Sequence, residues 1–359
     1  MDNIALYKNM MRIAIEKGQD IDLIKTTKMN NQFDFIDPNE FRDISKMLIV
    51  GIANIENIEK ILEQCEESTE IIILEDDKRY IDLFEERITS LRNNIKIRLC
   101  NLENMMLDND ELNKIIRENP ISNAEHYFEL LKKIDRSKHN NPLITYDSLD
   151  TVCINLYNRY DKKIAYKLME QSFKLLKEYG KLIVNLVLSD ELLNKNVSVL
   201  YENVEVKHIP QESEMFTKFE SLGYLASSYI WRGKLPTNIV NKVELRPFTI
   251  KAMKGVQGIC KEKGHAVLYK GPWKEVVDDD GHVLKRGERI AVCEKTFRNL
   301  TSKCYKNQIC GIQPYYEIEE EKAQVFDCSI APIRDPKVTK GIKKLKDNDS
   351  VDINEIKCC

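Results

Sequence analysis

The sequence has little glycine over its first two thirds and no long apolar run. Only Gly18, Gly51 and Gly180 precede residue 223, although the chain of 359 residues contains 13 glycines. No stretch approaches about 18 consecutive apolar residues, so we expect no membrane-spanning helix. The glycine pattern G-x-G-x-x-G is missing, which disfavours a dinucleotide-dependent oxidoreductase. The first residues do not form a basic and then apolar leader, so we expect a cytoplasmic rather than a secreted protein.

An excess of positive charge is also missing. The chain contains 55 Lys and Arg residues against 58 Asp and Glu residues, and its formal net charge is −3. This balance gives no electrostatic signature of a nucleic-acid or anionic-membrane partner. The hydrophobic share of 42% and the charged share of 31% are ordinary for a folded protein, and the length favours about two domains.

The ten cysteines gather towards the end of the chain. Three precede residue 250, and the other seven follow it: Cys260, Cys293, Cys304, Cys310, Cys328, Cys358 and Cys359. Stable disulfides are rare in a reducing cytoplasm, so this clustering indicates metal binding, catalysis or redox chemistry. The alternative is that most of these cysteines are small buried apolar residues. No pair has the C-x-x-C spacing of a zinc knuckle.

The rhythm of the first half predicts an α/β fold. Residues 1–45 indicate an amphipathic helix followed by a loop. Short apolar runs at 46–50, 70–74 and 95–99 predict strands, and they alternate with predicted helices at 57–65 and 78–92. Strands that are apolar throughout and alternate with helices favour a parallel sheet covered on both faces.

The pattern is interrupted by a polar segment and then resumes. Residues 101–148 are long for a connection, so we interpret them as an insertion with a helix at 123–134. After it we expect a strand at 151–155, a helix at 161–179 that ends at Gly180, a strand at 181–188, a helix at 212–222 and strands at 224–231 and 243–253.

The character of the sequence changes near residue 255. Segments 265–270, 273–277, 283–285 and 290–296 are rich in β-forming residues, and DDDG at 278–281 is typical of a hairpin turn. We therefore expect a small β-rich domain with little helix, followed by a mobile lysine-rich tail. The expected domains are 1–45, 46–254 with the insertion at 101–148, 255–334 and 335–359.

Polar and small residues follow the predicted strands where an open α/β sheet binds ligands. Gly51 and Ala53 form a tight turn after the first strand, and Glu75 ends the second, where an acid can accept from two ribose hydroxyls. Asn101 follows the third strand, and Asn155 ends the fourth. The alternative for Glu75 is a solvated acid beside the cap of the next helix.

Two segments resemble class I S-adenosylmethionine-dependent methyltransferases. They are DTVCIN at 150–155 and KEYGKLIV at 177–184, the second of which is similar to the L-K-x-G-G-x-L stretch of that family. The resemblance implies a Rossmann-like methyltransferase sheet with helices on both faces and S-adenosylmethionine as cofactor. The cofactor-binding positions that it implies are Gly51, Ala53, Glu75, Asp76, Asn101 and Asn155.

Later segments resemble the arsenite methyltransferase-like branch more narrowly. They are FESLGY at 219–224, LRPFTIKAMK at 245–254 and, in a cysteine-containing C-terminal extension, GHAVLYKGPW at 264–273 and VCEKTF at 292–297. The chain departs from the family at the glycine turn, where Ala53 and Ile55 stand at the places of glycines. The loop from 190 to 215 has no cysteine, so the arsenic site of that branch does not carry over.

The cysteines of the extension are candidate ligands for a soft metal ion. Thiolates bind such ions well, and Cys260 and Cys293 lie in the best-matched parts of the extension. Cys358 and Cys359 form a vicinal dithiol that can chelate a soft metal or metalloid. We expect His265 and His282 to be hydrogen-bonded histidines of the β-rich domain rather than catalytic bases.

Two functions of different classes follow. The first is S-adenosylmethionine-dependent methyl transfer to a small molecule or to a soft thiol or metalloid nucleophile, which needs alignment more than acid–base catalysis. The second is a catalytically silent methyltransferase fold that binds a metal or a partner protein through its cysteine-rich part. The first function implies a small-molecule substrate. A homo- or hetero-oligomer is compatible with both functions.

Overall fold

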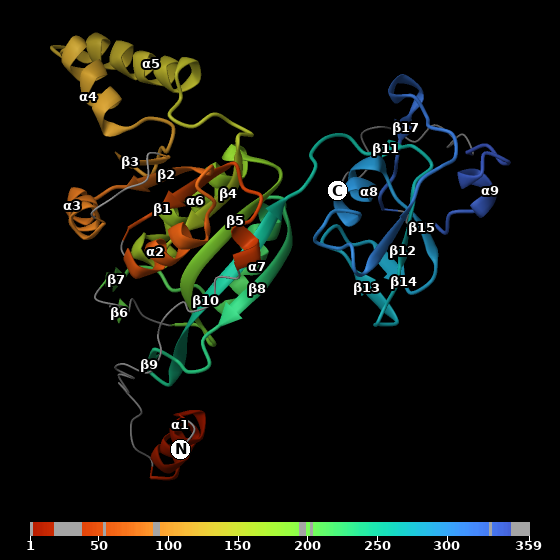
Figure 1. The fold of residues 1–359 in the computed structure, drawn as a ribbon, viewed down its shortest axis with the longest axis horizontal. Helices are drawn as coiled ribbons and strands as arrows, with labels where there is room; N and C mark the ends of the chain where they lie inside the picture. Colours follow the sequence, from red (N-terminus) through yellow and green to blue (C-terminus); the bar gives the residue numbers. More distant parts are fainter. Residues whose placement is uncertain are drawn as a thin grey trace. The chain divides into compact units, whose positions relative to one another are not determined.

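The computed structural model divides the chain into two compact units, Met1–Lys254 and Gly255–Cys359 (Figure 1). It describes residues 3–17, 38–52, 55–88, 94–193, 199–201, 204–329 and 332–345. No helix among these residues is long and apolar enough to cross a membrane. The two units are considered separately below.

The N-terminal unit is built on one mixed sheet. Its strands are β1 (Lys46–Val50), β2 (Glu70–Glu75), β3 (Ile95–Leu99), β4 (Leu149–Ile154), β5 (Leu176–Ser189), β8 (Tyr224–Arg232), β9 (Asn238–Val240) and β10 (Val243–Lys254). The strand order is β3-β2-β1-β4-β5-β10-β8, and β9 also pairs with β10. The first five strands pair in parallel, whereas β10 runs antiparallel to both β5 and β8. This parallel-rich, Rossmann-like sheet flanked by helices confirms the expected α/β fold class.

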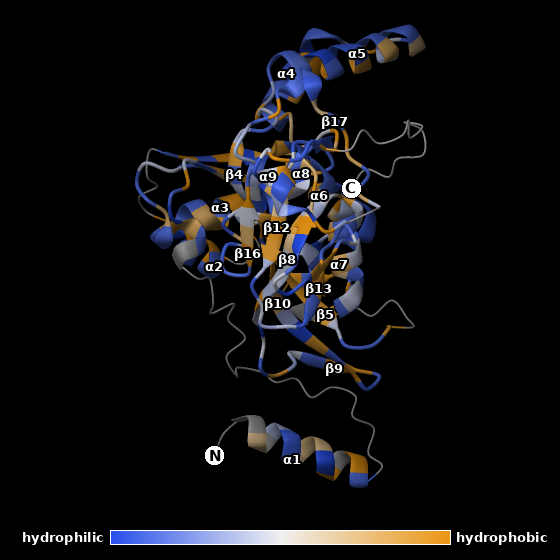
Figure 2. Cartoon of the chain, turned by 90° about the vertical axis from the view of Figure 1, so that its right-hand side faces the viewer, coloured by the Kyte–Doolittle hydropathy of each residue, from blue (hydrophilic) through white to orange (hydrophobic). Residues whose placement is uncertain are grey.

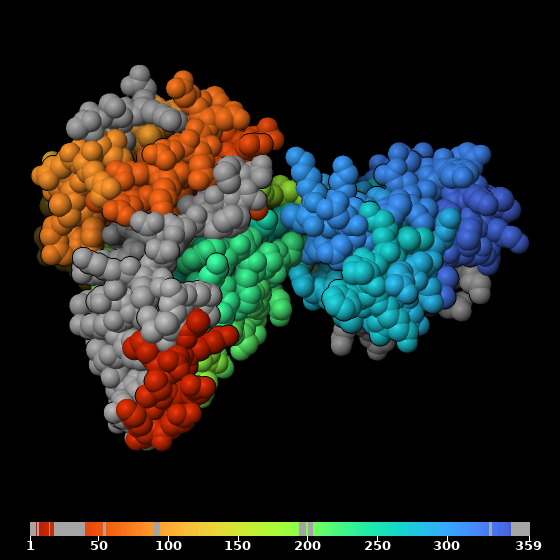
Figure 3. Space-filling view, turned by 60° about the horizontal axis from the view of Figure 1, so that its bottom comes forward, coloured from red at the N-terminus to blue at the C-terminus, as the bar shows by residue number. Residues whose placement is uncertain are grey.

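The helices of this unit precede or follow strands in the expected rhythm. They are α1 (Asn3–Glu16), η1 (Pro38–Phe41), α2 (Ile55–Gln64), α3 (Lys78–Arg87), α4 (Asn109–Glu118), α5 (Ala124–Asn140), η2 (Tyr157–Arg159), α6 (Lys162–Leu175) and α7 (Glu212–Ser221). A separate hairpin joins β6 (Val199–Tyr201) to β7 (Val204–Val206). The hydroxyl of Tyr7 in α1, drawn in red in Figure 3, donates to Glu244 at 2.6 Å.

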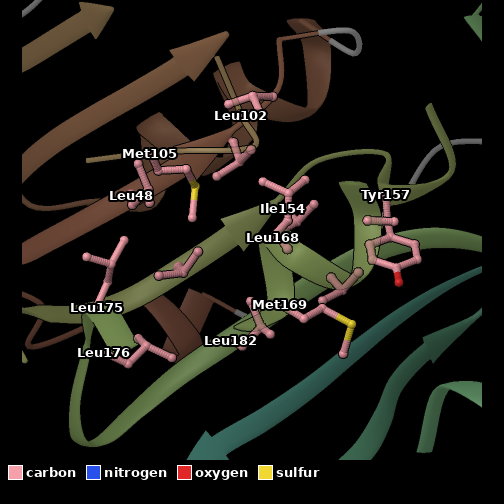
Figure 4. Packing of buried hydrophobic residues seen from close by; sticks show 14 of the residues in the cluster. Leu48, Leu102, Met105, Ile154, Tyr157, Leu168, Met169, Leu175, Leu176 and Leu182 are labelled. Carbon is pink, nitrogen blue, oxygen red and sulfur yellow. The ribbon is translucent and has the colours of Figure 1, made fainter. Parts of the chain in front are cut away.

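Both faces of the sheet carry a hydrophobic core because successive side chains of a strand point to opposite faces. In β1, Met47 and Ile49 pack under α2, α3 and η1, while Leu48 and Val50 pack with side chains of α6 and α7. Figure 4 shows part of the second cluster, where Met169 of α6 lies among leucines of the sheet. Each fully buried aliphatic side chain stabilises the fold by about 1.5–3 kcal/mol. The continuous apolar strands that the sequence shows are therefore explained by burial on both faces.

The prediction of one helix from 161 to 179 was wrong over its last four residues, 176–179. Helix α6 ends at Leu175, and β5 begins at Leu176 and pairs with Leu149. Gly180 is therefore a strand residue, and a side chain there would approach the Leu149 carbonyl oxygen at 3.0 Å. Apolar residues at 175 and 176 continue the helical stripe, so the pattern alone did not reveal where pairing with the neighbouring strand takes over.

The insertion between β3 and β4 is helical. The sequence predicted α5, although with an earlier end, and it did not predict α4. Ile115 of α4 and Leu130 of α5 pack in one small cluster with Leu107, which precedes α4. Both project from the rest of the N-terminal unit, and α5 shows hydrophobic patches among hydrophilic residues (Figures 1 and 2).

Within its described residues, the C-terminal unit contains three small sheets, which agrees with the predicted β-rich domain. Its elements are β11 (Lys261–Glu262), β12 (Ala266–Tyr269), β13 (Glu275–Val277), β14 (Val283–Lys285), β15 (Arg289–Ala291), α8 (Glu294–Leu300), β16 (Ile309–Ile312), η3 (Glu320–Lys322), β17 (Gln324–Val325) and α9 (Pro336–Thr339). Strand β12 lies between β15 and β16, β13 pairs with β14, and β11 pairs with β17. The predicted turn at 278–281 does join a hairpin, with Gly281 at a φ of +90°.

Two parts of this unit differ from the sequence prediction. The segment 290–296 is a strand only to Ala291, and α8 begins at Glu294 after Cys293, whose sulfur accepts a hydrogen bond from the Thr296 amide. The segment 335–345 includes α9, and the Thr339 carbonyl accepts from the Tyr315 amide at 2.8 Å. Residues 346–359 lie outside the described residues.

Candidate functional sites

The first candidate site lies at the carboxyl ends of β1, β2 and β4. Gly51 follows β1 with a φ of +90°, a conformation that side chains disfavour, and its amide donates to the Leu74 carbonyl at 2.8 Å. Glu75 is the last residue of β2, and Asn155 follows β4. Parallel strands bring these three residues to one edge of the sheet, which we call the crevice. Ala53, which was also predicted there, lies outside the described residues.

The Glu75 carboxylate is completely buried and saturated with hydrogen bonds. One oxygen accepts from the amide of Ile52 at 2.7 Å, and the other accepts from the amides of Asp76 at 2.8 Å and Asp77 at 3.0 Å. Arg159 donates to both oxygens, at 2.7 and 2.6 Å. Burial alone would raise the pKa of Glu75, but the hydrogen bonds and charge of Arg159 outweigh it and hold the pKa below its ordinary value.

Arg159 enters the crevice from η2, directly after β4. Besides Glu75, it pairs with Asp76 at 2.7 Å, and its guanidinium lies 4.5 Å from the ring centre of Tyr80. Burial and the neighbouring Glu75 raise the pKa of Asp76 to about 6, although Arg159 opposes that rise. Asp76 therefore takes part in the charge network of the crevice as a partner of Arg159.

Tyr160 lies directly over the glycine turn. It is only 3% exposed, and its hydroxyl oxygen lies 2.9 Å from the place that a β-carbon on Gly51 would occupy. Gly51 thus has the positive φ that a close ligand approach requires, but the space beside it is filled by a side chain of the same chain.

The two predicted asparagines have different positions. Asn155 is buried and accepts from the side chain of Asn57 at 3.0 Å, so it ties the turn after β4 to α2. Asn101 is exposed, and its side-chain oxygen accepts from the Glu103 amide at 2.9 Å in a local turn. The structure thus brings together Gly51, Glu75 and Asn155, with Asp76 beside them.

The residues of the crevice do not fit S-adenosylmethionine as they stand. A nucleoside cofactor needs acceptor oxygens for its ribose hydroxyls and space beside the glycine turn. Glu75 uses both oxygens within the protein, and Tyr160 fills the space beside Gly51. Sequence analysis missed Arg159 and Tyr160, because a polar pair after a strand has no periodicity that marks it.

The second candidate site is a group of three cysteines in the C-terminal unit. The sulfurs of Cys260, Cys293 and Cys328 all lie within 4.8 Å of one another. Cys260 precedes β11, Cys293 precedes α8 and Cys328 follows β17, so three distant segments converge here. The sequence predicted Cys260 and Cys293 as ligands and did not select Cys328. Cys358 and Cys359 lie outside the described residues.

The three thiols belong to a small buried cluster. Cys260 and Cys293 are fully buried and Cys328 is 9% exposed, and they cluster with Ala291 and Phe326. The sulfur of Cys293 also accepts from the Thr296 amide at 3.3 Å. Buried thiols that face one another in such a setting can share a single ion, because a neutral complex is cheap to bury whereas a separate charge is not.

Two histidines of this unit lie near Cys293, whose charge contributes to the pKa of both. His282 is buried and bonds through its Nδ1 to Asp278 at 2.8 Å. Burial lowers the pKa of His282, but the hydrogen bond and charge of Asp278 outweigh it and raise the pKa above its ordinary value. His265 stacks on Phe297 with ring centres 4.2 Å apart, and burial lowers its pKa. His282 is therefore a hydrogen-bonded histidine of the β-rich unit, as the sequence indicated, and His265 packs by ring stacking.

Comparison with known proteins gives one family match and several similar folds. Residues 256–344 match the model of a family described only as a domain of unknown function, DUF8838. No curated protein matches the chain. Among solved structures, the chain is similar to CrArsM, an arsenic(III) S-adenosylmethionine methyltransferase from Chlamydomonas reinhardtii, with 12% identity, coverage of 76% of this chain and 87% of that chain, and a TM-score of 0.40.

Two further structures are similar at the same level. YcgJ from Bacillus subtilis shares 10% identity over 62% of this chain and 97% of its own, with a TM-score of 0.40. A 1,6-didemethyltoxoflavin N1-methyltransferase from Burkholderia thailandensis shares 9% identity over 70% of this chain and 88% of its own, with a TM-score of 0.35.

Proposed function

We propose that this chain binds one soft, thiophilic ion through Cys260, Cys293 and Cys328. The observation that carries the proposal is the mutual approach of the three sulfurs within 4.8 Å. Thiolates bound to one ion at about 2.3 Å lie about 3.8 Å apart when the angles are tetrahedral. Small movements of these side chains would therefore complete a three-sulfur site.

The donor set favours a trivalent ion that accepts three ligands. Three thiolates and a trivalent ion form a neutral complex, whereas a divalent ion leaves a net charge of −1 in a buried place. Within the described residues the group supplies three thiols, so a four-coordinate zinc ion would need a further ligand. Arsenic(III) and antimony(III) are ions of the favoured class, so they are the first probes.

Methyl transfer from S-adenosylmethionine to a small molecule or soft nucleophile is the second candidate function. The specific observation in its favour is Glu75, an acid at the end of β2 beside the positive-φ turn at Gly51. Such a reaction requires Arg159 to leave the carboxylate first. The binding of a soft ion needs no comparable rearrangement, so we rank it first.

The test is a titration of the reduced, metal-free full-length protein with arsenic(III), antimony(III), zinc and cadmium under anaerobic conditions. Native mass spectrometry counts the ions per chain, and thiol titration counts the cysteines that become protected. With the terminal dithiol removed by Cys358→Ser and Cys359→Ser, we expect one trivalent ion per chain and three protected thiols, with weaker binding of zinc.

Matched variants make the result specific. Cys260→Ser, Cys293→Ser and Cys328→Ser should each weaken binding at least tenfold, whereas Cys310→Ser, at an exposed position in β16, should not. Each is made in a Cys358→Ser/Cys359→Ser background, which removes the terminal dithiol. Binding that persists in all three variants, or that vanishes in the background alone, would contradict the proposal.

A further inference from the structure

We infer that Arg159 and Tyr160 close the crevice and prevent the N-terminal unit from binding a nucleoside cofactor such as S-adenosylmethionine. The inference concerns the sheet of the N-terminal unit, and it does not depend on the three-cysteine site. The fold implies a nucleoside cofactor, whereas Arg159 and Tyr160 occupy the place that this cofactor would take.

The first step is the saturation of Glu75. Its carboxylate accepts five hydrogen bonds, two from Arg159 and one each from the amides of Ile52, Asp76 and Asp77. A carboxylate has about four lone-pair sites, so it has no capacity left for two further hydroxyl donors. A ribose could bind to Glu75 only by displacing the guanidinium.

The second step is the chemical similarity of the donors. A guanidinium presents two parallel N–H groups to one carboxylate, as two adjacent ribose hydroxyls would present two O–H groups. It also carries a positive charge, which the buried carboxylate favours over neutral hydroxyls. The contact with Asp76 at 2.7 Å and the ring of Tyr80 at 4.5 Å hold Arg159 in this position. Arg159 therefore substitutes for the ligand that the acid would otherwise bind.

The third step is the space beside Gly51. A glycine with a φ of +90° lets a ligand approach the backbone closely, because no side chain stands in the way. Here the hydroxyl of Tyr160 occupies that approach, 2.9 Å from the position of a β-carbon, and the side chain is buried. Arg159 and Tyr160 are neighbours in sequence, so one turn after β4 fills both halves of the crevice.

The experiment measures cofactor binding to the full-length protein by equilibrium dialysis with radiolabelled S-adenosylmethionine and S-adenosylhomocysteine at concentrations up to 1 mM. We expect no binding by the wild type. The variants Arg159→Met and Tyr160→Ala, and above all their combination, should bind, with a gain of at least tenfold. Arg159→Lys keeps the charge, loses the two-point contact and should show a smaller gain, so it serves if Arg159→Met fails to fold.

Arg79→Met is the matched control. Arg79 also makes a two-point contact with a carboxylate, that of Asp77, but its side chain is 86% exposed and outside the crevice. Its replacement should leave cofactor binding unchanged. Micromolar binding by the wild type would overturn the inference, and so would the absence of binding in every folded variant of Arg159 and Tyr160.

Discussion

Replacement of Arg159 by methionine should destabilise the N-terminal unit and reverse the pH dependence contributed by Glu75. The substitution keeps much of the side-chain volume but removes both hydrogen bonds to a carboxylate that is 0% exposed. Loss of one partner of a buried ion pair costs about 3–5 kcal/mol. The amides of Ile52, Asp76 and Asp77 still donate to Glu75, so we expect the lower end, about 3 kcal/mol at pH 7.

The effect of pH follows from the pKa of Glu75 in each protein. In the wild type, burial raises the pKa of Glu75, but Arg159 outweighs burial and the pKa is lowered. The stabilisation from Glu75 is therefore present above its ordinary pKa and is lost as the pH falls through the lowered value. Without Arg159, burial dominates and raises the pKa of Glu75. The folded variant then binds a proton more readily than its unfolded form, so its deficit should shrink as the pH falls from 7 to 5.

Urea denaturation followed by circular dichroism at pH 7 and pH 5 gives the free energy of unfolding of both proteins. Arg79→Met is the control, because its exposed pair with Asp77 should contribute less than about 1 kcal/mol. The combination Glu75→Gln with Arg159→Met removes both charges and should recover much of the loss. A deficit below about 1 kcal/mol, or one that does not change with pH, would refute the reasoning.

Three further outcomes follow from single residues. Gly51→Ala places a side chain at a φ of +90° and should lower the free energy of unfolding by about 1–3 kcal/mol in urea titrations; an unchanged value would mean that the turn relaxes freely. Asp278→Asn should lower the pKa of His282, measured by NMR. In the wild type, the stabilisation that comes from the raised pKa of His282 should be full below about pH 6.5 and be lost as the pH rises through the pKa of the folded protein. Burial raises the pKa of Cys100 to about 12, so mass mapping after brief alkylation of the native protein should find Cys310 modified and Cys100 intact; equal labelling would contradict that burial.

The sequence predicted the parallel part of the fold because burial on both sheet faces leaves a strong signal. Runs such as 47–50 and 71–74, which are apolar at every position, are typical of strands buried between two layers of helices. Where burial gives the same signal to a helix and a strand, the prediction failed. Residues 175 and 176 are both buried, and their assignment is decided by pairing with β4, which sequence pattern does not encode.

The candidate sites were predictable to different degrees. Glu75 could be selected because the end of the second strand is a fixed place in this fold, and the structure does place it in the crevice. Its partner Arg159 could not, because the pairing depends on how the turn after β4 folds back. Cys328 was missed for the same reason, since its approach to Cys260 depends on the pairing of β11 with β17.

The central claim is that three cysteines from separate segments share one soft ion. X-ray absorption spectroscopy of the protein loaded with one equivalent of arsenic(III), in the Cys358→Ser/Cys359→Ser background, counts the sulfur atoms bound to that ion. The account predicts three sulfur neighbours, reduced to two in Cys260→Ser, Cys293→Ser or Cys328→Ser and unchanged in Cys310→Ser. A spectrum dominated by oxygen neighbours, or three sulfurs that persist in Cys328→Ser, would contradict it.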